Sequence, residues 1–525
     1  MTRFALLLVA LGLVACAPAP TAAPPAAAPP TSQSAAQPTS PPAAKPTAAA
    51  ASTGAAPSGT LTWASGVDVE TMDPMVGTSS VSQSIYHALF DDLVIRDNNM
   101  QPQPSLATSW DTPDDRTWVF HLHDGVKFSN GDAVDAAAVK FSLDRFVDPA
   151  TKAAQASLLK PVKSVEVVDP HTVRLTTDAP YAGLLDVLAS YFYVMDPAIQ
   201  GQDANKMVIG SGPYQFVQWQ PGQQLVLKAN PNYWGTKPKL DQFVMKPISE
   251  AATRLVELQA GTSQLASPVP SLQYAQTEAT GATVAKAPGG NITIMFNGDV
   301  PPFDNVKVRQ AFNYAVDKQA IINGVLQGAG YPVASALRQG MLGYDDSLQP
   351  YPFDPDKAKS LLAEAGATNL NVELGSSDGR YPNDKLVAQA VAAQLGNIGV
   401  HANVTTSEYS AYVQAIIGHK LQFFLIGQVT PVSEINLPQA FLPTGALYQN
   451  YHNDNVAAQI VKGGQTLDRA QREAIYKQVN QQIHDDAPWL FLYAQQDAYG
   501  VSRKVTGFVA RPDGNIWIND LGIQS

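Results

Sequence analysis

Between residues 370 and 428, short apolar runs alternate with helix-length segments, and this order constrains the fold more than any other feature of the chain. The strand-like runs are LNVEL, VHANV and LQFFLIG, and the segments 382–397 and 407–417 between them are predicted to be helical. Strands that alternate with helices pack as a largely parallel sheet with helices on its faces. We therefore predict an α/β lobe whose ligand would lie beyond the carboxyl ends of the strands.

The first half of the chain is predicted to be rich in antiparallel strands. The segments SVEVVDPHTVRLTT and YQFVQWQPGQQLVLKAN alternate on both sides of a Pro-containing turn, which is typical of β-hairpins. The segment SEAATRLVELQAG predicts a helix with Ser249 as N-cap, Leu255 and Val256 on one face, and Gly261 at its end.

Two further helices are predicted before the α/β lobe. One is expected to run from a cap near Asp304 to Gly328, because apolar residues recur there at helical spacing. The other has Asp354 at its cap, Pro355 in its first turn and Gly366 at its end. The residues after position 58 are too many for a single hydrophobic core, so two or three domains are expected.

The N-terminus indicates secretion and lipidation. Arg3 precedes an apolar run over 4–14, which is about half the roughly 20 residues that a bilayer span needs. The sequence Leu-Val-Ala-Cys that ends it resembles the lipobox of bacterial lipoproteins, so residues 1–15 are predicted to be a signal peptide and Cys16 the lipidated residue. The alternative is ordinary cleavage after Ala15, which leaves a free thiol. Cys16 is the only cysteine, so disulfides, thiolate metal sites and a Cys nucleophile are not expected in the folded body.

Composition separates a tether from the folded body. Residues 17–58 consist almost wholly of Ala, Pro, Thr and Ser with the single charge of Lys45, so they have no apolar surface to bury. The chain carries a net charge of −11 without a dense Lys/Arg cluster. This balance disfavours nucleic acid and a polybasic membrane patch as partners.

The stretch GSSDGRYPND, residues 375–384, has two interpretations. Its first five residues fit the G-x-S-x-G pattern of a hydrolase, with Ser377 as nucleophile and Asp454 and His484 in the chain order of a triad. However, a nucleophile elbow requires the helix to start almost at the serine, and no helix can begin before Tyr381-Pro382. The secreted-hydrolase hypothesis is therefore the disfavoured alternative.

No other catalytic or metal-binding pattern is found. His121 and His123 are expected on one face of a strand, but no Cys or further His lies near them in the sequence. The pairs Asp91-Asp92 and Asp485-Asp486 are expected to have solvated or capping roles. Phosphate loops and H-E-x-x-H motifs are absent from the sequence. We expect no catalytic residue, no metal and no cofactor.

Five stretches in order along the chain resemble the peptide/nickel family of bacterial extracellular solute-binding proteins, family 5. They are LHDGVKFSNGDAVDAAAVKFSLDRF, IGSGPYQFVQWQPGQQLVLKANPNYWG, PPFDNVKVRQAFNYAVDKQAI, DPDKAKSLLAEAG and IHDDAPWLFLY. The resemblance implies an α/β, class II-like periplasmic-binding-protein clamshell of two lobes, with an extra subdomain inserted in the first lobe.

The same resemblance implies domain limits and hinges. The expected parts are a signal peptide at 1–15, a lipidated Cys and tether at 16–58, lobe I at 59–95, 207–285 and 496–525, the inserted subdomain at 96–206, and lobe II at 286–495. Chain crossovers between lobes are expected near Phe296, Asn297 and Tyr493. Closure around a ligand would be a hinge motion that tells the membrane partner whether the protein is loaded.

The resemblance also implies ligand contacts. Arg380 matches an Arg that grips the ligand's terminal carboxylate in dipeptide-binding relatives, and its planar guanidinium suits a bidentate carboxylate contact. The relatives' Asp for the ligand's amino group falls at Pro431, so Glu434 either replaces it or caps the next helix. Further candidates to line the cleft are Tyr381, Gln428, Tyr448, Asn450 and Trp489.

The function implied is that of the substrate-binding component of an ABC importer. Its cargo is expected to be an oligopeptide or a related small polar solute. An oligosaccharide, an opine-like conjugate or a chelated metal is the alternative cargo. We expect a monomer that is lipid-anchored outside the cytoplasm and that delivers its ligand to permease subunits.

Overall fold

The structure is a computed structural model, and it describes residues 57–524 except 379, 408, 429–431 and 446. Its largest sheet has 11 strands in the order β15-β14-β16-β12-β17-β11-β1-β10-β9-β8, with β13 beside β17. The strands of this sheet are β1 Thr60–Ser65, β8 Tyr214–Gln220, β9 Gln224–Ala229, β10 Gln242–Pro247, β11 Leu265–Ser267, β12 Thr283–Phe296, β13 Gly330–Pro332, β14 Leu370–Ser377, β15 Val400–Ser407, β16 Phe423–Gln428 and β17 Trp489–Val501.

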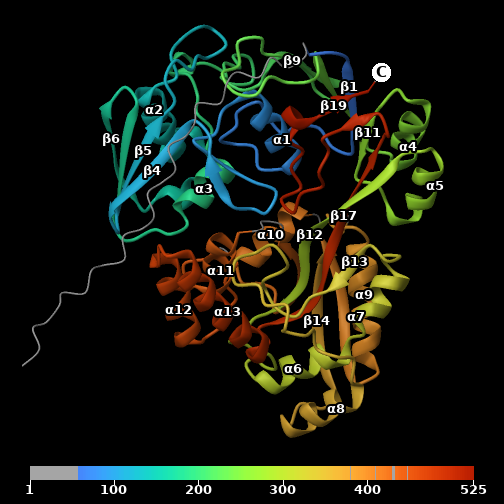
Figure 1. Cartoon of the computed structure of the whole chain (residues 1–525). Coiled ribbons are helices and arrows are strands. Elements are labelled where there is room, and N and C mark those ends of the chain that lie inside the picture. The colour runs from blue at the N-terminus through green and yellow to red at the C-terminus, as the bar shows by residue number, and fades with distance from the viewer. Residues whose placement is uncertain (1–56, 379, 408, 429–431, 446, 525) are drawn as a thin grey trace, which may run out of the picture. The chain divides into compact units, whose positions relative to one another are not determined.

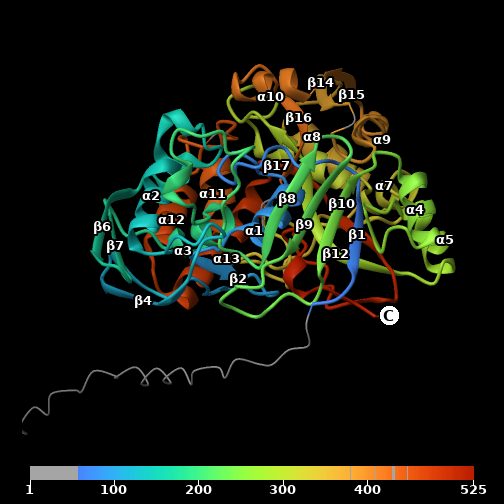
Figure 2. The same cartoon turned by 90° about the horizontal axis from the view of Figure 1, so that it is seen from above.

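The first half of the chain forms the part of the sheet from β11 to β8, which we call lobe I together with residues 502–524. β1 is parallel to β10 and β11, and β8 pairs antiparallel with β9, so the hairpin predicted there is confirmed. Figure 2 shows β8, β9, β10 and β1 side by side. The helices of this half are α1 Ser80–Leu89, α4 Ala251–Ala260 and α5 Tyr274–Ala279.

A separate four-stranded sheet lies within the segment expected to be an inserted subdomain. Its order is β4-β5-β7-β6, and β6 and β7 form the second predicted hairpin. The bounds are β4 Ala107–Asp114, β5 Thr117–Leu122, β6 Val162–Asp169 and β7 Thr172–Thr177, accompanied by α2 Ala136–Val147 and α3 Leu184–Tyr191. Two short strands, β2 Val94–Arg96 and β3 Pro102–Pro104, pair just before it, and β18 Val505–Thr506 pairs with β19 Gly522–Ile523 near the C-terminus.

The second half contains the predicted α/β arrangement, which we call lobe II. β14 is parallel to both β15 and β16, as the alternation of strands and helices predicted. The helices of this half are α6 Val306–Ala315, α7 Lys318–Gly324, α8 Pro355–Glu364, α9 Asp384–Gly396, α10 Tyr409–Ile417, α11 Ser433–Phe441, α12 Asp454–Gln465 and α13 Arg469–Asp486. The α8 prediction is confirmed, because Asp354 caps the helix and Pro355 stands in its first turn.

Two helix predictions need correction. The single helix expected to end at Gly328 is interrupted at Val316, which is extended, and Asp317 then caps α7 by accepting a hydrogen bond from the Ala320 amide at 2.8 Å. A capping Asp competes with helix continuation, which explains the break.

In α4, Ser249 is not the N-cap; Glu250 stands there without a side-chain cap. The buried face of this helix contains Arg254, Leu255 and Leu258, whereas Val256 is 61% exposed. Arg254 is drawn inward because its guanidinium donates hydrogen bonds to the Ile248, Ser249 and Pro268 carbonyls. Of the two residues predicted to form the apolar face, Leu255 is buried as expected and Val256 is not.

β12 and β17 are the long strands that connect the two lobes (Figure 1). They pair from Thr283 opposite Val501 to Met295 opposite Trp489, with one irregularity between Ile292 and Thr293 and another between Pro288 and Asn291. Before this irregularity β17 also pairs with β11 of lobe I, and after it β12 pairs with β16 of lobe II. The crossover therefore lies at the irregularity.

The hinge positions expected at Phe296 and Asn297 lie beyond this crossover. Phe296 stacks on Phe303 and Phe423 in the lobe II core, at centroid distances of 4.9 and 5.3 Å. Tyr493 is buried in the same core, opposite Ile292 and close to the crossover. The hinge role of Phe296, Asn297 and Tyr493 therefore stays a prediction of the resemblance.

The lobes share a packed interface. Val432 and Ile435, from the segment around α11, belong to the hydrophobic core that is otherwise built from lobe I and the inserted subdomain. The Ala182 amide donates a hydrogen bond of 2.8 Å to the Gly464 carbonyl across the same interface. None of the helices in the described part of the chain combines the length and apolar character needed to cross a bilayer.

Candidate functional site

A cavity of about 410 Å³ lies where the two lobes meet. Lobe I contributes the start of α1 and the loop 512–515, lobe II contributes Arg380 and Val432, and the crossover strands contribute Gly290 and Asp497. A depression of about 510 Å³ over β14, α9 and β15 has no Asp, Glu, Lys or Arg in its lining and belongs to lobe II alone. The interlobe cavity is thus the candidate ligand site, and its volume is within the usual range for small-molecule sites.

Arg380 projects from the loop that follows β14, where the α/β pattern predicted the ligand site. Its guanidinium carbon lies 5.2 Å from the ring centroids of both Tyr381 and Tyr409. Stacking on aromatic faces orients a guanidinium while leaving its N–H groups available. No ion pair or side-chain hydrogen bond joins this guanidinium to the residues that the structure describes. Arg380 is therefore a cation that lines the cavity and has no ion-pair partner among the described residues.

Asp384 fixes the conformation of the Arg380 loop. Its Oδ2 accepts hydrogen bonds from the Arg380 and Tyr381 amides at 3.0 and 3.2 Å, and from the Ser377 hydroxyl at 2.8 Å. Since Asp384 is 2% exposed, these contacts are shielded from water and hold the loop firmly.

The geometry does not support the hydrolase alternative. Ser377 is fully buried and donates its proton to Asp384, which also accepts two backbone amides. His484, the proposed base, has its Nδ1 2.7 Å from the Ala334 carbonyl oxygen and stacks on Tyr351. Asp454 is the first residue of α12. The three residues of the proposed triad thus have separate structural contacts.

We expect Ser377→Ala to leave any esterase or peptidase turnover of the preparation unchanged. The variant should lose about 1 kcal/mol of folding stability, because one buried hydrogen bond to Asp384 is removed. Turnover of ester and peptide substrates together with thermal unfolding checks both parts. Activity that is reproducible in the wild type and abolished by this substitution would contradict the binding role.

Glu434 does not line the cavity and is not the N-cap of α11. Its Oε1 accepts a hydrogen bond from Nε of Arg472 at 2.9 Å, and these two side chains are 4% and 6% exposed. A second buried pair, Arg96 with Asp186 at 2.8 Å, lies close enough to influence it. Burial and the Asp186 carboxylate raise the pKa of Glu434 to about 7, while Arg472 and Arg96 oppose this shift.

The N-cap of α11 is Val432, without a side-chain cap, so Glu434 has a third role that the sequence did not suggest: a buried ion pair at the lobe interface. Pro431, where the relatives' Asp would fall, lies outside the described residues, as does Cys16.

The remaining predicted contact residues do not line the cavity. Tyr381 is 5% exposed; it supports Arg380 with its ring and has its hydroxyl 3.4 Å from the Gly427 carbonyl. Gln428 ends β16 and is paired with Asn291, and Trp489 stacks on Phe441 at 4.7 Å in the lobe II core.

Tyr448 and Asn450 are also structural. The Tyr448 hydroxyl lies 3.1 Å from the Tyr451 carbonyl, and the Asn450 amide lies 3.3 Å from Asn297 Oδ1. These positions were selected for residue type, but type alone does not tell a cleft residue from a core residue of a large lobe.

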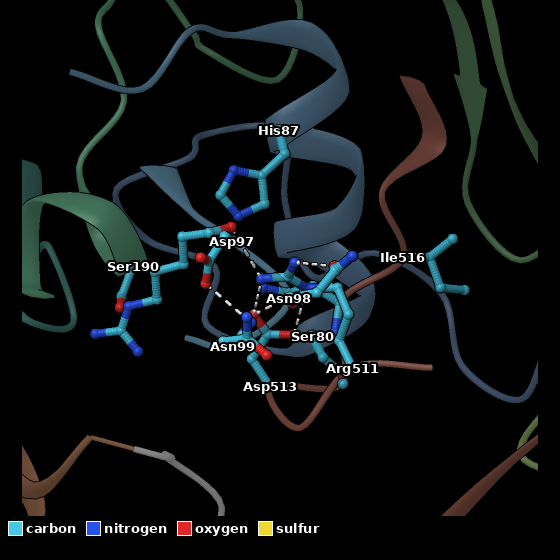
Figure 3. A network of polar contacts seen from close by, with 12 residues as sticks. Ser80, His87, Asp97, Asn98, Asn99, Ser190, Arg511, Asp513 and Ile516 are labelled. Carbon is cyan, nitrogen blue, oxygen red and sulfur yellow. Dashed lines mark hydrogen bonds and ion pairs between the residues drawn. The ribbon is translucent and has the colours of Figure 1, made fainter. Parts of the chain in front are cut away.

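The loop 512–515 is held against the cavity by Arg511 (Figure 3). Its guanidinium donates hydrogen bonds to Asp513 Oδ2 at 2.8 Å and to Asn98 Oδ1 at 2.9 Å, and lies 5.0 Å from the Trp517 ring centroid. The Asn515 amide also donates to Asp513, at 3.0 Å. The Asp513 carboxylate is consequently engaged within the protein although it borders the cavity.

Sequence reasoning missed Asp497, which lines the cavity from β17. The available signal was an acidic residue in the strand-like run LYAQQDAYG, two residues after Gln495 and therefore on the same face. Across the described residues, no group of three or more His, Cys, Asp or Glu side chains is placed to hold a metal ion.

Comparisons with known proteins agree with this architecture. A family model described as "Bacterial extracellular solute-binding proteins, family 5 Middle" matches residues 101–444. The glutathione-binding protein GsiB of Pectobacterium atrosepticum is 32% identical over 471 residues, which cover 86% of this chain and 91% of that protein.

Solved structures share the fold over most of the chain. HbpA2 from Haemophilus parasuis superimposes with a TM-score of 0.81 at 23% identity, covering 89% of this chain and 100% of that chain. The periplasmic binding protein DppA from Helicobacter pylori, in complex with the peptide STSA, gives a TM-score of 0.75 at 25% identity, with 89% and 98% covered. The expected α/β clamshell of two lobes is confirmed, and the chain belongs to family 5 of the bacterial extracellular solute-binding proteins.

Proposed function

We propose that this protein captures a peptide or peptide-like solute outside the cytoplasm and delivers it to the permease of an ABC importer. The observation that carries the proposal is the position of Arg380. It faces a cavity bordered by both lobes, and its guanidinium has no ion-pair partner among the described residues. A carboxylate on the ligand would supply that partner through charge-assisted hydrogen bonds.

The comparisons favour this class of cargo. Glutathione and the peptide STSA, named for GsiB and DppA, are both short peptides with a free carboxylate. A cavity of about 410 Å³ suits such a small ligand better than a long polypeptide. Hinge closure about β12 and β17 would bring Arg380 of lobe II toward the α1 wall of lobe I, so that both lobes contact the same molecule.

Mass spectrometry of the ligand released by unfolding the purified protein tests this proposal. We expect a small peptide, including γ-linked ones, with at least one carboxylate. Release of a neutral oligosaccharide would contradict a carboxylate contact with Arg380. Release of an opine-like conjugate or a metal chelate would show that the cargo is not a peptide.

We further propose that the protein acts as a monomer tethered to the outer face of the membrane by a lipid on Cys16. Removal of residues 1–15 would leave Cys16 as the first residue of a tether that ends near residue 58. Such a tether allows the lobes to turn toward the permease.

Replacing Cys16 by Ser should release the protein from the membrane fraction while its folded body remains intact. A diacylated residue holds the protein through buried acyl chains, whereas the Pro/Ala-rich tether has no affinity for lipid. Fractionation followed by thermal unfolding measures both effects. Retention of the variant in the membrane fraction would contradict lipidation at this residue.

A further inference from the structure

Asp497 occupies the part of the cavity wall that β17 forms. It pairs in register with Ala287 of β12, and it shares a strand face with Gln495, which also lines the cavity. No hydrogen bond or ion pair connects its carboxylate to another residue in the described part of the chain. Asp497 is partly buried. A carboxylate with reduced access to water and without a partner is disfavoured, so a ligand group is a natural counterpart.

Gly289 leaves room for the Asp497 carboxylate, whereas a Cβ at Gly514 would make only an ordinary contact with it. A Cβ on Gly289 would lie 2.8 Å from Asp497 Oδ1, and a Cβ on Gly514 would lie 3.8 Å from its Oδ2. Gly289 falls in the irregularity of the β12–β17 pairing, between Pro288 and Asn291. The β12 backbone at Gly289 therefore lies close to the Asp497 carboxylate, at a place where a side chain would displace the carboxylate. The next residue, Gly290, lines the cavity and has no side chain.

The other carboxylates at the cavity are already engaged. Both oxygens of Asp513 contact the Arg511 guanidinium, at 2.8 and 3.2 Å. Glu70 Oε2 accepts the Thr78 and Ser79 amides at 2.6 and 3.1 Å. Glu434 does not line the cavity and is paired with Arg472 at the lobe interface. Asp497 is thus the carboxylate at this cavity best able to accept a ligand's cation.

One buried cation, Arg338, acts electrostatically on Asp497. Arg338 is 1% exposed, donates from Nε to the Gly289 carbonyl and does not line the cavity. Burial raises the pKa of Asp497, and Arg338 acts in the opposite direction. Arg338 thus favours the charged carboxylate although it is not one of the residues that line the cavity. The competing explanation is that Asp497 serves only as a distant counterion of Arg338.

We propose that Asp497 receives the amino group of the ligand while Arg380 holds a carboxylate, so that the site selects zwitterions. This assignment rests on the proposed function and makes Asp497 the residue that determines specificity for a free amino group. Asp497 would then provide the amino-group contact that was one of the two roles considered for Glu434. The ligand would then be fixed at two points, one on a lobe II loop and one on the crossover strand.

Matched ligand pairs test this assignment. The full chain is unfolded to release cargo and refolded. Glutathione and the peptide Ser-Thr-Ser-Ala are then titrated calorimetrically, each with its N-acetylated and its carboxyl-amidated derivative. The variants are Asp497→Asn, which conserves shape, and Asp111→Asn as a control outside the cavity lining, where the Asp111 side chain is 73% exposed.

The wild type is expected to prefer the free amine over the acetylated form by about 10-fold or more, as for a charge-assisted contact in a closed site. Asp497→Asn should remove this preference by weakening only the free-amine ligand. Asp111→Asn should keep the preference, because this exposed carboxylate does not line the cavity.

Three results would overturn the assignment. Equal loss for both forms, with a lower melting temperature, would make Asp497 a counterion of Arg338. A wild-type protein that binds the free and acetylated forms equally would show that the amino group is not recognised. If that protein still rejects the amidated form, the carboxylate contact of Arg380 and the proposed function hold without a role for Asp497. If none of these probes binds the wild type, the peptide-binding function fails and Asp497 loses its role with it.

Discussion

Replacing Arg380 by Ala is expected to weaken ligand binding by about 30-fold to several thousand-fold, which corresponds to roughly 2–5 kcal/mol. The reason is that the ligand carboxylate would be enclosed between the lobes without its cation. Calorimetric titration of the refolded protein measures the loss. Arg380→Lys should retain only part of the affinity, because an ammonium keeps the charge but not the two parallel hydrogen bonds.

Lys385→Ala is the matched control. Lys385 stands in the first turn of α9, close in sequence to Arg380, but it pairs with Asp378 at 3.5 Å in an exposed position and does not line the cavity. This variant should bind as the wild type does. An Arg380→Ala protein with unchanged affinity would show that the ligand is a neutral solute held by other groups.

Replacing Arg472 by Met is expected to cost roughly 3–5 kcal/mol of folding stability, since Glu434 would be left buried and without its cation. Arg472 also donates hydrogen bonds to the Thr466 and Leu467 carbonyls, at 2.7 and 3.1 Å, which the variant loses. Chemical denaturation measures the change. Adding Glu434→Gln should recover part of the loss, because the uncompensated charge is removed.

The control for this prediction lies on the same helix, α13. Lys477 pairs with Glu473 at 3.1 Å, and their side chains are 45% and 43% exposed. Lys477→Met should therefore change stability by less than about 1 kcal/mol. Comparable losses for the two variants would mean that the Glu434–Arg472 pair is not shielded from water as the structure places it.

Strong local signals predicted the parts of the fold that depend on neighbours in sequence. The order β14, α9, β15, α10, β16 followed from apolar runs of distinct length, and Asp354 with Pro355 marked the start of α8 because capping acts within one turn. The break between α6 and α7 was missed because the apolar period continues through it. The break occurs where Val316 is extended and Asp317 accepts a hydrogen bond from the Ala320 amide.

The ligand site was harder to predict because it is assembled from distant segments. Arg380 was selected because it matches an Arg of dipeptide-binding relatives, and its place after a strand end of a parallel sheet supported that choice. Glu434 was considered as the nearest acid in sequence, but its environment depends on Arg472 and on Asp186 of the inserted subdomain. Asp497 reaches the cavity only through the long pairing of β12 with β17, which the sequence did not reveal.

A crystal structure of the refolded protein with its identified ligand is the most direct test of ligand capture between the lobes. We expect the ligand to occupy the cavity between α1, the loop 512–515 and the crossover strands, with a carboxylate on the Arg380 guanidinium and an amino group on Asp497. A ligand bound elsewhere, or bound in this cavity with Arg380 turned away from it, would contradict ligand capture by these residues.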